Sequence, residues 1–259
     1  MSHVSALRKF AGHVCAGALF LFALASGARA ETALSAPVFG HPDGRGIPVT
    51  MDGYSLAMTG TGFFVSKEGH FLTPFHVAGG CIRRAVLRPE GAYEATAVAM
   101  YAHEDIAVMK SAAPHTTAEL APPNRLPVGT PFVIVRYYHL GGMASRSAVA
   151  ARYLGTVDLR PIDFAVRAAE PVVGGNSGSP VVRLDGGVAA MVTAITRENA
   201  HVALGIDSHV LAQALQTAGV PFRWLSKKIA ASPAAGNAAA AGLAMQFTFP
   251  IACYVAPKP

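Results

Sequence analysis

The sequence has few of the residues that mark a disulfide-rich, metal-binding or strongly charged protein. Its 259 residues include three cysteines, one tryptophan and only 14% charged residues. No Cys-x-x-Cys or His-x-x-x-His pair occurs, so the ligand spacing of a zinc site is missing and we expect no metal. No Lys/Arg block interleaved with aromatic residues is present, which argues against nucleic-acid binding.

Long apolar runs are also scarce, and the one long run lies at the start of the chain. Arg8 and Lys9 precede an apolar stretch over about residues 10–25, and Ala28-Arg29-Ala30 follows it. These are the three parts of a secretory signal peptide over residues 1–30, with cleavage before Glu31. The alternative is an uncleaved membrane anchor, for which the run is short. We therefore expect a periplasmic or secreted protein without a membrane span after cleavage.

Composition divides the remaining 229 residues of the 259 into three parts. Residues 31–45 are rich in Pro, Gly and Ala and suggest an exposed lead-in. Residues 46–225 form the ordered body. Residues 226–259 begin with an Ala/Gly-rich stretch typical of a flexible tether, and a short strand at 245–249 precedes Pro250.

The body consists of short apolar segments separated by Gly- and Pro-containing turns, a pattern typical of antiparallel barrels or sandwiches. A helix is expected at 208–218, since Asp207 or Ser208 can cap it and Gly219 can end it. The strands are expected at 62–66, 71–73, 93–101, 106–109, 132–135, 147–157, 164–167, 180–184 and 188–195.

Three short segments carry residues suited to nucleophilic catalysis. Ser177 follows Gly175 in a glycine-rich turn, where backbone N–H groups can face a developing oxyanion. His76 directly follows an expected strand, and Asp105 directly precedes one. Taken singly, each has an ordinary structural alternative: a loop between strands, a histidine at a strand end, a turn aspartate. Together they stand in the order His, Asp, Ser, which is that of the chymotrypsin type.

The chain resembles the trypsin-like peptidases, and specifically the protease domain of the high-temperature-requirement A (HtrA) family. The similar segments are 60–65, 72–77, 105–108, 126–129, 175–182, 184–186 and 192–195, with further similarity at 205–206 and into the helix that follows. The resemblance implies an all-β fold of two antiparallel six-stranded β-barrels of the chymotrypsin type with a C-terminal helix. Barrel 1 would cover about residues 46–122 and barrel 2 about 127–206.

The resemblance also implies a serine endopeptidase that acts on protein or peptide substrates without a cofactor. Ser177 would be the nucleophile, His76 the general base and acid, and Asp105 the group that orients His76. The backbone N–H groups of Gly175 and Ser177 would form the oxyanion hole. The chain departs from the family at Ser179, where Gly is commoner, in the loop 137–142, and in lacking room for a PDZ domain after Leu225.

The primary specificity pocket follows from the same resemblance. Pro171, six residues before the nucleophile, would lie at its base, so no acidic group is present there to attract Lys or Arg. The apolar lining predicts cleavage after small or medium aliphatic residues, and Ser179 suggests glutamate as the runner-up. The other lining residues would be Val172, Val173, Thr193, Ala194 and Ile195.

Two further alternatives concern activity and the thiols. A catalytically silent peptide-binding protein on the same fold is the rival function, because a fold alone does not establish activity. After export, Cys81 and Cys253 are the remaining thiols, and an oxidising compartment favours a disulfide between them. Such a bond would close a very long loop and pin the tail to barrel 1, whereas the alternative is two unpaired cysteines.

Overall fold

The structure is a computed structural model that describes residues 34–35, 50–140, 143–159, 161–226 and 233–257. All of them belong to one compact unit, residues 31–259. The predicted signal peptide lies outside the described residues, as does most of the predicted lead-in. From the lead-in, the structure describes only β1 (Leu34–Ser35), which pairs with strand β9 (Met143–Leu159).

Six antiparallel strands close barrel 1 in the order β14-β5-β6-β7-β4-β3, because β14 also pairs with β3. Turn residues separate the strands, and β2 (Thr50–Met51) extends the sheet beside β3. A one-turn helix, α1 (Phe75–Ala78), follows β4. The six strands are β3 (Tyr54–Phe64), β4 (His70–Thr73), β5 (Arg83–Arg88), β6 (Gly91–Tyr101), β7 (Ile106–Ser111) and β14 (Thr248–Val255).

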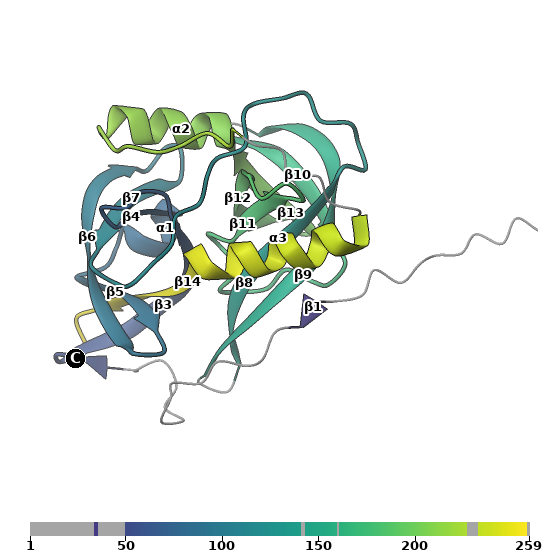
Figure 1. Ribbon diagram of the computed structural model, residues 1–259. Coiled ribbons are helices and arrows are strands. Elements are labelled where there is room, and N and C mark those ends of the chain that lie inside the picture. Colours follow the sequence, from purple (N-terminus) through teal and green to yellow (C-terminus); the bar gives the residue numbers. More distant parts are fainter. Residues whose placement is uncertain (1–33, 36–49, 141–142, 160, 227–232, 258–259) are drawn as a thin grey trace, which may run out of the picture. The chain divides into compact units, whose positions relative to one another are not determined.

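Barrel 2 is likewise a closed set of six antiparallel strands, in the order β9-β10-β13-β12-β11-β8, with β8 pairing back to β9. Figure 1 shows the two barrels side by side, barrel 1 in blue with its strand β14 in yellow, and barrel 2 in teal and green. The predicted fold class is therefore confirmed. Besides β9, the strands are β8 (Pro131–Leu140), β10 (Ile162–Ala168), β11 (Pro180–Arg183), β12 (Val188–Ile195) and β13 (Val202–Asp207).

The C-terminal residues differ from the flexible tether and short tail that the sequence suggested. Residues Pro233–Phe247 form helix α3, because alanine is the best helix former and one face of the helix reaches the core. Strand β14 then completes barrel 1, so this barrel is not contained in residues 46–122. Pro250 is accommodated because pairing of β14 with β5 begins only at Ile251. In the described part of the chain, the residues after α2 thus build α3 and β14 and not a PDZ domain.

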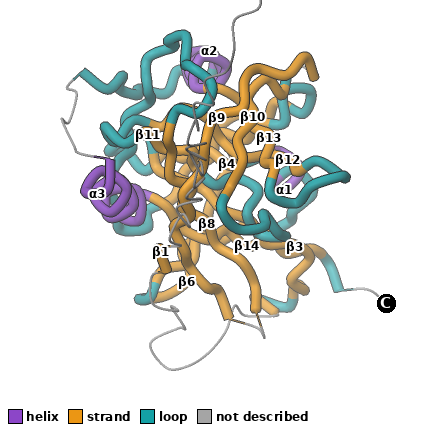
Figure 2. The backbone as a smooth tube through the Cα atoms, turned by 90° about the vertical axis from the view of Figure 1, so that its right-hand side faces the viewer, coloured by secondary structure: helices purple, strands orange, loops and turns teal. Residues whose placement is uncertain are grey.

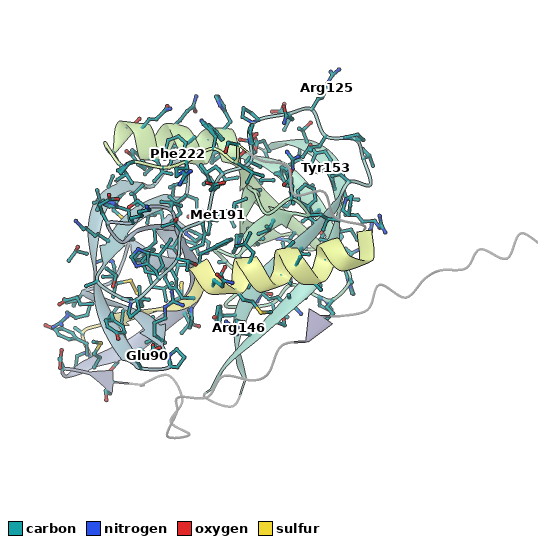
Figure 3. All side chains as sticks on the ribbon, viewed as in Figure 1. Glu90, Arg125, Arg146, Tyr153, Met191 and Phe222 are labelled. Atoms are coloured by element: carbon teal, nitrogen blue, oxygen red, sulfur yellow. A yellow bond between two sulfur atoms is a disulfide. The ribbon has the colours of Figure 1, made fainter. Side chains whose placement is uncertain are left out.

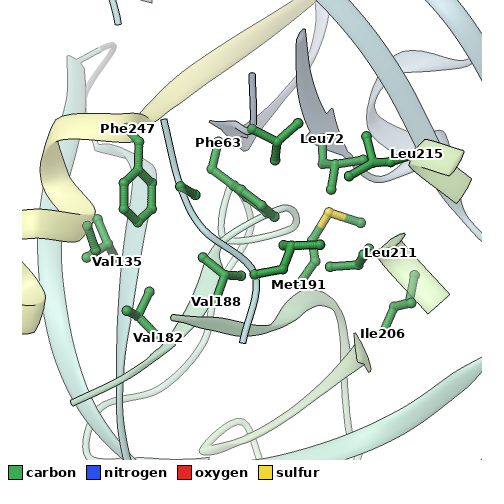
Figure 4. Close-up of a cluster of buried hydrophobic side chains, with 14 of the residues drawn as sticks. Phe63, Leu72, Val135, Val182, Val188, Met191, Ile206, Leu211, Leu215 and Phe247 are labelled. Carbon is green, nitrogen blue, oxygen red and sulfur yellow. The ribbon is translucent and has the colours of Figure 1, made fainter. Parts of the chain in front are cut away.

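An apolar core fills the space between the two barrels. Figure 4 shows Phe63 and Leu72 of barrel 1 facing Val188 and Met191 of barrel 2, all at most 1% exposed. Phe247 of α3 joins the same core from the side. Figure 3 labels Arg146, whose guanidinium donates to the Met245 carbonyl near the end of α3 at 3.2 Å. The C-terminal helix is therefore bound to both barrels through the core.

The predicted helix at 208–218 is α2 (Ser208–Thr217). Its N-cap is Asp207, whose carboxylate accepts hydrogen bonds from the N–H groups of His209 and Val210. Figure 2 shows α2 and α3 at the outside of the strands, on different sides. Among the described residues, no helix is long and apolar enough to span a membrane.

Candidate active site

His76 is held by the short turn that leaves strand β4. Pro74 precedes α1, and the next two residues after His76, Val77 and Ala78, are buried in barrel 1 and fix the helix. Thr73 is fully buried and donates a hydrogen bond to the Thr61 carbonyl at 2.9 Å. The His76 side chain remains 41% exposed, so the packing of its neighbours sets its position while its ring faces solvent.

Asp105 lies immediately before β7 and binds His76 twice. Its carboxylate accepts the His76 backbone N–H at 2.9 Å and lies 2.8 Å from the ring Nδ1. With Nδ1–H donating to this carboxylate, the other ring nitrogen, Nε2, is left as the acceptor that a general base needs. The backbone of Asp105 has a φ of 54°, a left-handed conformation that aspartate adopts more readily than most residues.

A third group, Thr193 on β12, also contacts this carboxylate. Its hydroxyl donates to Asp105 Oδ2 across the boundary between the barrels. Burial alone would raise the pKa of Asp105, but the hydrogen bonds from His76 and Thr193 outweigh it and leave the pKa below its usual value. The sequence assigned Thr193 to the wall of the specificity pocket, and no sequence signal linked it to Asp105, 88 residues away.

Ser177 lies on the loop between β10 and β11, and its main chain contacts β3, the strand that α1 also contacts. The Ser177 carbonyl accepts the Thr61 N–H at 2.7 Å. A Cβ added to Gly60 would lie 2.6 Å from the Val77 side chain and 3.1 Å from the Ser177 carbonyl oxygen, so the serine backbone and the residue after His76 lie against the same side of β3 at Gly60. No hydrogen bond joins the Ser177 hydroxyl to the His76 ring among the described contacts. Such bonds in apo enzymes often tighten only when substrate is bound.

Position 178 has no room for any residue larger than glycine. Its φ is 94°, and an added Cβ would lie 1.7 Å from the Thr61 carbonyl oxygen and 2.9 Å from Pro74. Its N–H donates to the Val192 carbonyl at 2.7 Å. The residue after Ser177 is therefore pressed between β3 and β12, which fixes the serine at the meeting point of the two barrels.

The two predicted oxyanion donors are backbone N–H groups of the serine loop. Within the described residues, neither the Gly175 N–H nor the Ser177 N–H donates to another protein group. Gly175 adopts a φ of 92°, and its carbonyl accepts the Thr61 hydroxyl at 2.8 Å. Asn176, which is fully buried, bonds both the Val173 N–H and the Tyr137 carbonyl. The sequence pattern included Asn176 in the serine motif but gave it no role.

The six residues predicted for the specificity pocket do not share one environment. Pro171, Val173 and Ile195 are exposed, the latter two at 47% and 45%. Ala194 is half-buried. Val172, at 3% exposed, packs in the core of barrel 2, so its side chain faces away from a substrate. Together with the Asp105 contact of Thr193, this leaves Pro171, Val173, Ala194 and Ile195 as the exposed or half-buried members of the predicted pocket.

Cys81 and Cys253 form a disulfide in the structure, with their sulfur atoms 1.99 Å apart. Cys81 follows α1, and its sulfur lies 3.4 Å from the Val77 carbonyl. The bond therefore links strand β14 to the turn that carries His76. No group of three or more His, Cys, Asp or Glu side chains suited to hold a metal is found in the described part of the chain.

The sequence model of the trypsin-like peptidase domain matches residues 60–191, which include His76, Asp105 and Ser177. The chain belongs to the trypsin-like peptidase family. It is also 30% identical over 158 residues to the uncharacterized protein y4bJ of Sinorhizobium fredii, where the match covers 58% of this chain and 24% of that protein. The chain thus spans about a quarter of the length of this relative.

Solved structures of trypsin-like peptidases share the fold of this chain. The Rv3671c protease of M. tuberculosis in its active form superimposes with a TM-score of 0.55 at 22% identity, over 74% of this chain and 93% of that one. The HtrA-type protease AlgW with a decapeptide gives 0.53 at 20% identity, over 61% and 51%. The serine endoprotease from Yersinia pestis gives 0.53 at 20% identity, over 67% and 60%. The chain therefore has the trypsin-like serine protease fold and resembles the HtrA proteases.

Proposed function

We propose that this protein is an exported serine endopeptidase in which His76, Asp105 and Ser177 form the catalytic triad. The observation that carries the proposal is the His76–Asp105 pair, in which the carboxylate binds both the backbone and the ring of the histidine. This pair lies beside a serine loop whose main chain is bound to β3. A histidine held in this tautomer by a carboxylate is the base that a serine on a tight turn needs, which supports the proposed triad.

The chemistry follows from these groups. His76 Nε2 takes the proton of the Ser177 hydroxyl as the serine oxygen attacks the peptide carbonyl, and Asp105 stabilises the imidazolium that forms. The N–H groups of Gly175 and Ser177 donate to the negatively charged oxygen of the tetrahedral intermediate. His76 then gives its proton to the leaving amine, and water releases the acyl group by the reverse sequence of steps.

A peptide substrate also has a strand edge to pair with. On one side, β12 pairs with β13 as far as Ile195. On the other side, its register with β11 ends at Met191. Residues 193–195 thus have no strand partner on that side among the described residues, and an extended peptide can pair there. Proteins and peptides are therefore the proposed substrates.

We further propose cleavage after small or medium aliphatic residues. The exposed Val173 and Ile195 offer apolar contact, and Pro171 brings no negative charge for Lys or Arg. One methylene in such a pocket discriminates by about 1–3 kcal/mol. Sequencing of the peptides released from a denatured proteome measures this directly. Products that end mainly in Lys, Arg or Glu would contradict the pocket assignment.

The proposed location is the periplasm or the exterior, supported by the predicted signal at residues 1–30 and by the disulfide, which is typical of oxidising compartments. The intact mass of the exported protein checks both statements: we expect an N-terminus at Glu31. Retention of residues 1–30 would contradict the signal peptide.

Covalent labelling by a fluorophosphonate probe tests the proposed activity, because only an activated serine reacts. We expect the wild type to be labelled and Ser177→Ala to be unlabelled at the same melting temperature. Peptide hydrolysis should fall by about 10⁴–10⁶-fold in Ser177→Ala and His76→Ala, and by about 10⁴-fold in Asp105→Asn. A folded wild type that binds peptides but neither labels nor hydrolyses would be the silent binding protein instead.

A further inference from the structure

Arg136 occupies an unusual place in barrel 2. The residues at 132 and 134 on β8 face the apolar interior of this barrel and are at most 1% exposed. Since side chains alternate along a strand, Arg136 continues this inward-facing series. Its cross-strand partner, Ser147, continues the inward series of β9. A charged side chain with only 6% exposure thus lies at the end of an apolar barrel.

The guanidinium group of Arg136 is directed at the start of the serine loop. Its Nη2 donates to the Glu170 carboxylate in an ion pair, and its Nη1 donates to the Pro171 carbonyl at 2.5 Å. Its Nε donates to the Ser147 hydroxyl at 2.9 Å. Glu170 and Pro171 begin the segment that ends at Ser177. One side chain therefore ties β8 and β9 to the base of this loop.

The next residue on β8 ties down the other end of the same loop. The Tyr137 N–H donates to the Thr61 hydroxyl at 3.2 Å, and that hydroxyl donates to the Gly175 carbonyl. The Tyr137 carbonyl accepts the side-chain amide of Asn176 at 2.9 Å. Two adjacent residues of one strand thus bind the loop at positions 170, 171 and 176, and at 175 through Thr61.

Stability alone does not account for an arginine at position 136. Removing a guanidinium from water carries a large desolvation penalty, and replacing a whole buried ion pair by apolar side chains of similar volume is often neutral or stabilising. A guanidinium that binds a carboxylate and a neighbouring carbonyl at the same time, however, fixes both the position and the direction of the backbone between them. This precision matters most where backbone N–H groups must be preorganised for an oxyanion.

We infer that Arg136, through its ion pair with Glu170 and its bond to the Pro171 carbonyl, is a positioning residue that holds the loop 170–177 in the conformation in which Gly175 and Ser177 present their N–H groups. The inference rests on the proposed function. Arg136 itself touches neither substrate nor reacting atoms. Its loss is expected to slow acylation of Ser177 while leaving the fold in place.

The test compares Arg136→Met, which keeps the length and packing of the side chain, with a matched control, Arg183→Met. Arg183 lies in the same barrel and pairs with Asp185 at 2.6 Å, away from the serine loop. We expect Arg136→Met to lower the second-order rate of fluorophosphonate labelling by about 10–100-fold, a part of the 10²–10³-fold effect of one oxyanion donor. Its melting temperature should match that of Arg183→Met, which should label at the wild-type rate.

Two additional variants keep the inference falsifiable if Arg136→Met does not fold. Glu170→Gln removes the charge but keeps a hydrogen-bond acceptor, and Arg136→Lys keeps the charge but loses the two-point contact. Both should lower kcat for a peptide substrate more than they raise KM. Folded Arg136→Met, or folded Glu170→Gln, that labels at the wild-type rate would overturn the inference. A wild type that does not label would overturn the proposed function, and the inference with it.

Discussion

Strand β14 closes barrel 1 from the far end of the chain, so the disulfide that holds it should contribute strongly to stability. Replacing Cys253 by serine removes a bond between residues 172 positions apart. Chain entropy for a loop of that length gives a loss of about 5 kcal/mol. A typical domain is stable by about 5–15 kcal/mol, so a third or more of the stability would disappear. At about 2–4 °C per kcal/mol, the melting temperature should fall by about 10–20 °C.

Urea unfolding of the purified oxidised protein, followed by the fluorescence of Trp224, measures this loss. Wild type in reductant should unfold at the same urea concentration as Cys253→Ser without it. The control is the double variant Cys81→Ser/Cys253→Ser. Reductant should leave the urea concentration at its unfolding midpoint unchanged. A shift of less than about 1 kcal/mol in the wild-type free energy of unfolding on adding reductant, or two free thiols in the oxidised wild type, would contradict a stabilising disulfide.

Three further predictions follow from the geometry of the site. Gly178→Ala should lower the free energy of unfolding in urea by well over 1 kcal/mol, because the new Cβ would lie 1.7 Å from the Thr61 carbonyl oxygen. The control Gly174→Ala should leave the free energy of unfolding nearly unchanged, because a Cβ there meets nothing within 4 Å. Thr193→Val should lower kcat several-fold with little change in KM in steady-state kinetics, and unchanged kcat would contradict the role of its bond to Asp105. Since the folded pKa of Asp105 is lowered, its contribution to stability is present above about pH 4 and is lost as pH falls through the folded pKa. The acid-induced loss in unfolding free energy should therefore be smaller in Asp105→Asn, and identical pH dependence would refute this.

From local patterns, the sequence by itself predicted short antiparallel strands and the candidate triad, and its resemblance to the trypsin-like peptidases implied the two six-stranded barrels. Turn-separated apolar segments indicated strands, and Asp207 with Gly219 bracketed the helix that the structure has at Ser208–Thr217. The chain order of His76, Asp105 and Ser177 is that of the chymotrypsin type and differs from the orders of the other serine hydrolase classes. Each of these signals is read within a few neighbouring residues, and the order of motifs needs no knowledge of distance in space.

Only the tertiary structure decided which distant segments contact one another. The Ala/Gly-rich run has the composition of a linker, yet it forms helix α3. The helix is held against the protein because Ala244 and Phe247 pack into the apolar core between the barrels. Strand β14 finds its place through pairing with β3 and β5, whose residues lie far earlier in the chain. The contacts of Thr193 with Asp105 and of Arg136 with Glu170 arise in the same way. A side chain's role in such contacts depends on which surface the fold presents to it, and no local pattern of residues records that surface.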